Sequence, residues 1–97
     1  MSNRPKAEAT MQFEEDRAIA TEWRFAPGAE TGWHRHEHDY VIVPILDGSL
    51  TIETNDGVIE TDLKAGQSYF RRAGVEHNVI NSSVGEFAFV EIEMPKA

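Results

Sequence analysis

The sequence predicts an all-β domain, either a sandwich or a barrel, built from short strands. Segments in which apolar and polar residues alternate recur about every eight to twelve residues, and turns containing glycine separate them. No stretch keeps a helical pattern of apolar residues over about ten positions. The 97 residues are enough for one such domain and too few for two.

The amino-terminal part is expected to contain one strand. Residues 1–9 are polar and show no periodicity, so we expect a flexible tail there and a single domain over residues 10–97. Residues 14–20 suggest one helical turn, but the alternating pattern of residues 19–25 is a better strand signal. Residues 26–32 contain proline and glycine and are expected to form a loop.

The middle of the chain contains a run of β-branched residues and a predicted hairpin. In the run over residues 40–46, Pro44 has no N–H to donate and therefore indicates an edge strand or a bulge. An Asp-Gly pair and an Asn-Asp-Gly triplet lie on either side of residues 49–54. These are strong turn signals, and the second predicts a tight hairpin into residues 58–61.

Three further strands are expected over residues 68–71, 77–81 and 87–94. In the last strand Glu91 and Glu93 alternate with apolar residues, which indicates an exposed face of carboxylates. An inward position for these carboxylates, behind a metal site, is the alternative.

Composition excludes several classes of function. The net charge of −8 repels phosphate, and no run of basic residues is longer than Arg71-Arg72, so we expect no nucleic-acid partner. No apolar run approaches the length of about 18 residues that a membrane helix needs, and the first residues lack a hydrophobic signal core, so we expect a cytoplasmic protein without a membrane partner. Because the chain has no cysteine, a metal site would have to use histidine and carboxylate ligands.

Three of the four histidines, His34, His36 and His38, are spaced two residues apart. Residues two apart share one face of a strand, so His34 and His36 would present their imidazoles on the same side. Such a pair suits a divalent metal ion, and His77 on a later strand is the candidate third ligand. Singly, each histidine would more often be a polar residue on a solvated strand face.

The fourth metal position has two nearby candidates, His38 and Asp39. Regular strand alternation places Asp39 on the face opposite His36, and a bulge would be needed to bring it in. Water is therefore the expected occupant. Three histidines with open positions suit catalysis or ligand capture better than a closed structural site.

These segments resemble the two signature motifs of the cupin family. In the first motif, five residues separate Gly28 from His34 and His36, and Gly48 closes the segment. The motif glutamate is missing, because its expected place falls on Tyr40 or Val41. The second motif is matched at every spacing by glycine, histidine and asparagine, with arginine replacing its proline; the residues are Gly66, Arg72, Gly74, His77 and Asn81.

The resemblance, which spans residues 28–81, implies a cupin-type double-stranded β-helix, or jelly-roll barrel, that binds a divalent metal ion (Fe, Zn, Mn or Ni) through His34, His36 and His77. It also implies metal-dependent chemistry, oxygenase-like or isomerase-like, on a small organic acid or related metabolite. Cupins without the motif glutamate include three-histidine iron dioxygenases that act on thiols or diketones. Whether this chain is an enzyme stays open, and the alternative is a non-catalytic module that binds or senses a small ligand.

Four residues are candidates for the substrate pocket. Trp33 and Tyr40 would contact a ligand at the barrel mouth or pack in the sheet, and Arg71 and Arg72 would attract a carboxylate or remain solvated. We also expect a homodimer, because a jelly roll of this size exposes edge strands, and cupins often pair through their sheets. Residues 11–13 or 87–94 would supply the contact.

Overall fold

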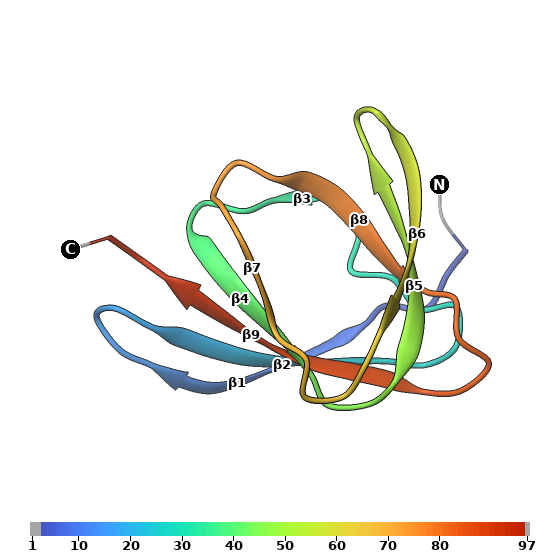
Figure 1. Ribbon diagram of the computed structural model, residues 1–97, viewed down its shortest axis with the longest axis horizontal. Coiled ribbons are helices and arrows are strands. Elements are labelled where there is room, and N and C mark those ends of the chain that lie inside the picture. The colour runs from blue at the N-terminus through green and yellow to red at the C-terminus, as the bar shows by residue number, and fades with distance from the viewer. Residues whose placement is uncertain (1–2, 97) are drawn as a thin grey trace.

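The computed structural model describes residues 3–96, which form two antiparallel sheets facing each other (Figure 1). Within those residues there are nine strands and no helix, which confirms the all-β prediction. In chain order the strands are β1 (Glu8–Glu14), β2 (Ile19–Phe25), β3 (His34–Arg35), β4 (Asp39–Pro44), β5 (Gly48–Thr54), β6 (Gly57–Leu63), β7 (Tyr69–Arg71), β8 (Glu76–Asn81) and β9 (Phe87–Met94). The helical turn considered for residues 14–20 is a tight turn, closed by a hydrogen bond from the Glu15 N–H to the Ala18 carbonyl.

The two sheets have the strand orders β1-β2-β9-β4-β7 and β3-β8-β5-β6. Most neighbouring strands are distant in sequence, because the chain crosses repeatedly from one sheet to the other, as in a jelly roll. The β5–β6 hairpin is confirmed, with Thr54 paired to Gly57 at its tip. Gly57 has a φ of 124°, a conformation that glycine adopts without strain.

Pro44 is the last residue of β4, which lies between β9 and β7 and is therefore not an edge strand. The prediction that this proline marks an edge strand is therefore wrong for β4 as a whole. The physical reason is local: β7 pairs with β4 only from Tyr40 to Ile42, so beyond Ile42 one side of β4 has no strand partner. Pro44 stands where the missing N–H breaks no strand ladder.

Part of the segment expected to be a flexible tail, residues 1–9, has backbone hydrogen bonds from Pro5 onward. Residues 1 and 2 lie outside the described part. The Ala7 N–H donates to the Glu30 carbonyl at 2.8 Å, the Glu30 N–H donates to the Pro5 carbonyl at 3.0 Å, and β1 starts at Glu8. Backbone hydrogen bonds thus begin at Pro5 and a strand begins at Glu8, because a distant backbone segment supplies partners that local sequence does not reveal.

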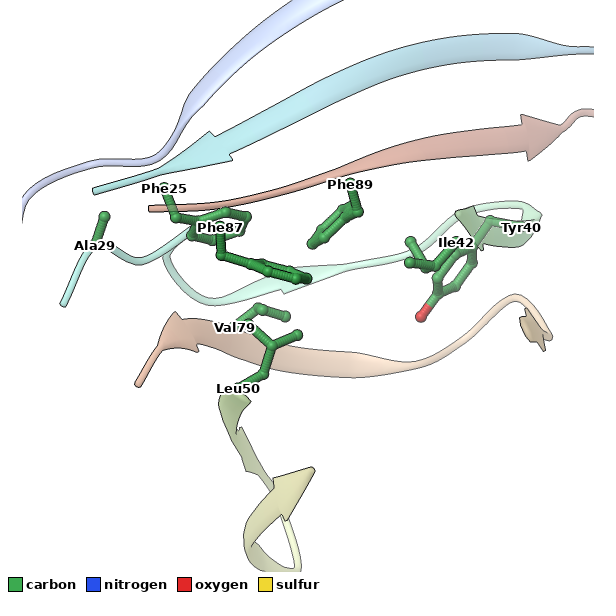
Figure 2. Packing of buried hydrophobic residues seen from close by; sticks show 8 residues of the cluster. All are labelled: Phe25, Ala29, Tyr40, Ile42, Leu50, Val79, Phe87 and Phe89. Atoms are coloured by element: carbon green, nitrogen blue, oxygen red, sulfur yellow. The ribbon is translucent and has the colours of Figure 1, made fainter. Parts of the chain in front are cut away.

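The hydrophobic core fills one end of the space between the sheets (Figure 2). Phe25, Phe87 and Phe89 form a cluster with ring centroids 5.5 to 6.2 Å apart, and Leu50 and Val79 approach it from the other sheet. Farther along β4, the side chains of Tyr40 and Ile42 lie beside the part of the interior that remains open. The core therefore supports a cavity at its other end.

The motif glycine Gly48 has a packing reason. A Cβ atom added there would collide with the Phe87 ring and would come within 2.9 Å of the Ser83 hydroxyl. Glycine is needed at this position because the β5 backbone approaches the aromatic core too closely for any side chain.

No helix long and apolar enough to cross a membrane occurs among residues 3–96.

Candidate metal centre

Three histidine side chains converge on one point from strands β3 and β8. His34 and His77 are directly paired across these strands, and His36 follows β3 with its N–H bonded to the Val75 carbonyl. The Nε2 atom of His36 lies 3.0 Å from that of His34 and 3.1 Å from that of His77. The sequence analysis selected these three residues, and the structure brings them together.

The surroundings keep two of these imidazoles neutral. His36 and His77 are both buried. Burial lowers the pKa of His36 to about 3, assisted by His34 and His77, and lowers the pKa of His77 to about 4, assisted by His34 and Arg71. Neutral imidazole is the form that ligates a metal ion, so both rings are in the ligating state at neutral pH.

The ring orientation of His34 is fixed by the backbone. Its Nδ1 lies 2.8 Å from the Gly32 carbonyl oxygen, which can only accept a hydrogen bond. Nδ1 therefore carries the proton in the neutral ring, and Nε2 presents a lone pair to the other two histidines. A metal-ligating histidine usually donates its other ring N–H to an acceptor such as this carbonyl.

The cluster fits a cation. The three Nε2 atoms face one another, with His36 at 3.0 and 3.1 Å from the other two. A divalent ion accepts all three lone pairs at once, and three imidazoles are a common ligand set for zinc, iron, copper and nickel. The donor set thus fits the metal ion that the sequence predicted.

A cavity of about 230 Å³ adjoins the histidines. Its apolar wall is formed by aliphatic and aromatic residues of both sheets: Ile42, Leu50, Ile52, Val79 and Phe89. Besides the three histidines, its polar lining residues are Trp23, Thr31, Arg35, Glu37, His38, Tyr40, Tyr69, Glu91 and Glu93. This volume is below the usual range for drug-sized ligands and suits a small metabolite.

Tyr40, one of the two positions where the motif glutamate was sought, covers one side of the centre. Its ring stacks on His36 with centroids 3.8 Å apart and an interplanar angle of 16°. The side chain is 2% exposed and lines the cavity. Burial raises the pKa of Tyr40 above its usual range, as burial also does for Tyr69, so both phenols stay protonated and can donate hydrogen bonds.

The expectation that Glu91 lies on an exposed face of β9 is wrong. Its side chain is buried, and its Oε2 lies 3.7 Å from Nδ1 of His36, too far for a hydrogen bond. Burial, together with Glu93, raises the pKa of Glu91 to about 7, and a hydrogen bond from the Trp23 indole lowers it. Glu91 follows Phe87 and Phe89 at a spacing of two, so the position of these aromatic residues was the sequence signal for its inward face.

The fourth-ligand candidates stand outside the cluster. The Asp39 carboxylate accepts a hydrogen bond from the Ala73 N–H at 2.8 Å, which directs it to the turn before β8. His38 lines the cavity wall but is not among the residues grouped as metal ligands within the described chain. Trp33 is half exposed, at 51%, and does not line the cavity.

The two arginine candidates differ in position. Arg71 lies over the Tyr69 ring, 4.5 Å from its centroid, and lines a second cavity, of about 360 Å³. That cavity shares Tyr40, Ile52, Tyr69 and His77 with the first. Arg72 lies over the Phe70 ring at 5.6 Å and lines neither cavity. Arg71 is therefore the better placed of the two to meet a ligand at the centre.

Comparison with known proteins gives a consistent result. The family model described as Cupin domain matches residues 21–93. The chain is 61% identical over 94 residues to the β-alanine degradation protein BauB of Pseudomonas aeruginosa, which covers 97% of this chain and 99% of that protein.

Solved structures show the same architecture. A cupin domain from Bordetella pertussis superimposes with a TM-score of 0.95 at 53% identity, over 99% of this chain and 100% of the other. A protein with a double-stranded β-helix domain from Klebsiella pneumoniae gives a TM-score of 0.77 at 28% identity, over 98% and 81%. The polyketide cyclase RemF of Streptomyces resistomycificus, at 20% identity, a TM-score of 0.72 and coverage of 98% and 71%, shares the fold.

Proposed function

The chain belongs to the cupin family, and from that premise we propose that it is a metal-dependent protein that acts on a small organic acid inside its barrel. The observation that carries the proposal is the convergence of three imidazole nitrogens beside a cavity with an apolar wall. His34, His36 and His77 would hold a divalent ion, with Fe, Zn, Mn and Ni as the candidates. Such an ion supplies Lewis-acid or redox chemistry when bound.

The protein's own residues provide the environment for a substrate. Tyr40 covers His36 and, with the apolar wall, limits the access of water to the histidines. The phenol groups of Tyr40 and Tyr69 stay protonated and are available as hydrogen-bond donors to a bound oxygen atom. Glu91 places a carboxyl group on the Nδ1 side of His36, away from the other two histidines.

Arg71 supports a carboxylate as part of the substrate. Arg71 lines the second cavity together with Tyr69 and His77, in a protein whose net charge is negative, and its guanidinium also donates to the Phe70 carbonyl at 2.9 Å. A planar guanidinium suits a carboxylate because it can donate two parallel hydrogen bonds. The name of the BauB relative, a β-alanine degradation protein, points in the same direction, since β-alanine is a small acid.

The reaction class we favour is oxygenase-like or isomerase-like. The test is elemental analysis of protein purified without a histidine tag, followed by oxygen uptake by the iron(II) form with a panel of small acids, thiols and diketones. Metal at about one ion per chain together with consumption or conversion of one compound supports the proposal. If the iron form binds a compound and neither consumes oxygen nor changes it, the protein is a binding or sensing module instead.

A further inference from the structure

Asn78 is buried, at 5% exposure, and does not line the cavity. Both polar atoms of its side chain form hydrogen bonds. It follows His77 on β8 and therefore faces the opposite side of the sheet. Its Nδ2 donates to Oε1 of Glu30 at 2.8 Å and to Oε1 of Glu53 at 2.9 Å. Its Oδ1 accepts the Gly32 N–H at 2.9 Å. Two carboxylates on one side and an N–H on the other leave the amide one orientation.

Gly32 connects this amide to the metal centre. Its N–H is held by Asn78, and its carbonyl accepts the Nδ1–H of His34 at 2.8 Å. The same carbonyl accepts the Thr31 hydroxyl at 3.0 Å. Gly32 has a φ of 88°, so the chain makes a turn there that a side chain would strain. The position of one backbone residue thus sets both the tautomer and the direction of the His34 ring.

The amino-terminal segment holds the other side of this arrangement. Arg4 forms an ion pair with Glu30 at 3.2 Å, and the backbone of Glu30 is bonded to Pro5 and Ala7. Glu30 is 6% exposed. Contacts therefore run from the amino-terminal segment through Glu30 and Asn78 to Gly32, and from there to His34.

We propose that Asn78 is a positioning residue of the metal centre, which acts on His34 through the Gly32 backbone, with Glu30 fixing the Asn78 amide. The inference rests on the proposed function in that it gives these contacts a role toward a metal ion. The assignment is specific for asparagine. An aspartate would turn an oxygen toward Glu30 and Glu53, lose both donated hydrogen bonds and bring three carboxylates together in a buried place.

The first experiment compares the wild-type protein with Asn78→Asp in the metal-free state. Nitrogen-15 NMR of the imidazoles at about pH 8 reads the tautomer of His34 without any metal. The wild type should show one tautomer, protonated at Nδ1, and the variant should show a mixture. A calorimetric titration with Zn²⁺ should give a dissociation constant about 10- to 100-fold larger for the variant. If the variant keeps both the single tautomer and the wild-type Zn²⁺ affinity, the proposal fails.

A rescue variant separates positioning from general damage. In Asn78→Asp combined with Glu30→Gln, the glutamine amide can donate to the new carboxylate, which restores one hydrogen bond in the reverse direction and removes one charge. Part of the lost Zn²⁺ affinity and of the single tautomer should return. The double variant overturns the proposal if it gains thermal stability over Asn78→Asp while the tautomer mixture and the Zn²⁺ affinity stay unchanged.

Two controls complete the design. Glu53→Gln still accepts from Asn78 and does not contact Gly32, so its tautomer and affinity should equal those of the wild type. Phe87→Leu weakens the core away from the histidines and should lower stability without changing the tautomer. If Asn78→Asp does not fold, Asn78→Ser takes its place, because it removes the same two donated hydrogen bonds without adding charge. The proposal then fails if Asn78→Ser keeps both the single His34 tautomer and the wild-type Zn²⁺ affinity. A wild type that binds no Zn²⁺ but shows the single tautomer, lost in the variant, would refute the proposed function and leave the positioning contacts established.

Discussion

His34 and His77 face each other as a directly paired couple in the antiparallel ladder of β3 and β8, with ring centroids 4.8 Å apart. The register of this two-residue strand decides whether the centre exists, because a slip of one residue turns every side chain to the other face. The turn before β8 fixes the register: the His36 N–H donates to the Val75 carbonyl, and its own carbonyl accepts the Gly74 N–H. The spacing between Gly74 and His77 thus helps to set the register of β3 and β8.

Replacement of a cluster histidine should remove the metal. In His77→Ala, metal content after purification should fall to a small fraction of the wild-type value, because two imidazoles hold a divalent ion much more weakly than three. His38→Ala is the matched control, since His38 lines the same cavity outside the cluster. Elemental analysis of both variants checks this. Full metal content in His77→Ala would refute the ligand assignment, and equal loss in His38→Ala would make His38 a ligand.

The stability of the metal-free protein should depend on pH. The pKa of His36 is lowered to about 3 and that of His77 to about 4, so between these values and the ordinary pKa of 6.5 the unfolded chain binds protons that the folded chain does not. The free energy of unfolding should therefore fall as pH decreases below 6.5, by at most about 1.4 kcal/mol per pH unit for each histidine. Urea denaturation of metal-free protein from about pH 7.5 to 5 measures this, and a flat profile in Glu91→Gln would contradict it.

Glu91 should partly mask that effect. Its pKa is raised to about 7 in the folded protein from 4.5, so between these values the folded chain holds a proton that the unfolded chain has released. Its contribution to stability is complete below 4.5 and is lost as pH rises through about 7, which is opposite to the histidines. In Glu91→Gln the opposing contribution disappears, and the fall in stability between pH 6.5 and 5 should be steeper than in the wild type. Equal slopes would show that Glu91 is ionised in the folded state.

Arg71 and Arg72 form a natural pair for testing carboxylate recognition. Arg71 lines the cavity that includes His77, whereas Arg72 does not. For a small carboxylate that binds the wild type, Arg71→Ala should weaken affinity by about tenfold or more, and Arg72→Ala should leave it unchanged. Calorimetry with the acid and with its uncharged amide checks this. Loss of affinity for both compounds to the same degree would show that Arg71 does not recognise the charge.

Much of the fold follows from local signals, and the exceptions are set by distant partners. The turn at Asn55 to Gly57 is encoded where it occurs, because the glycine supplies the required φ. The burial of Glu91 depends on which face of β9 the core occupies. Phe87 and Phe89 indicate that their face of β9 is buried, whereas the charge of Glu91, on the same face, suggested that it is exposed.

The limits of prediction at the site have the same origin. The three candidate ligands were predicted from spacing within two short segments, whereas the residues that contact them come from elsewhere in the chain. Asn78 was not singled out, because nothing local distinguishes it from a surface residue until Glu30 and Glu53 are placed beside it. Asp39 was considered as a ligand because it lies close to His36 in sequence, and its hydrogen bond to Ala73 arises from a turn far along the chain.

Gly48 offers a test of the core. In Gly48→Ala the new methyl group meets the Phe87 ring, so the free energy of unfolding should fall by about 1 to 3 kcal/mol. Gly85→Ala is the control, because a Cβ atom there meets nothing within 4 Å and the backbone is not in a left-handed conformation. That variant should differ from the wild type by less than about 0.5 kcal/mol. Urea denaturation measures both, and equal stability of the two variants would contradict the packing argument.

The last prediction concerns self-association. Of the two segments expected to supply a dimer contact, residues 87–94 form β9, which lies between β2 and β4 and so has no free edge. Residues 11–13 belong to β1, the outer strand of its sheet, which is exposed along its length and carries Met11 at 58% and Phe13 at 47% exposure.

An exposed apolar edge strand is commonly covered by a second copy of the chain, and β1 is the longer of the two outer strands of the larger sheet. Light scattering at about 100 μM should therefore give the mass of a dimer. Met11→Lys combined with Phe13→Lys should shift the protein toward monomer, because two cations on each strand would repel across the interface. Val84→Lys, at an exposed apolar residue away from β1, should not. A monomeric wild type would exclude the dimer, and a double variant that stays dimeric would move the interface to another edge.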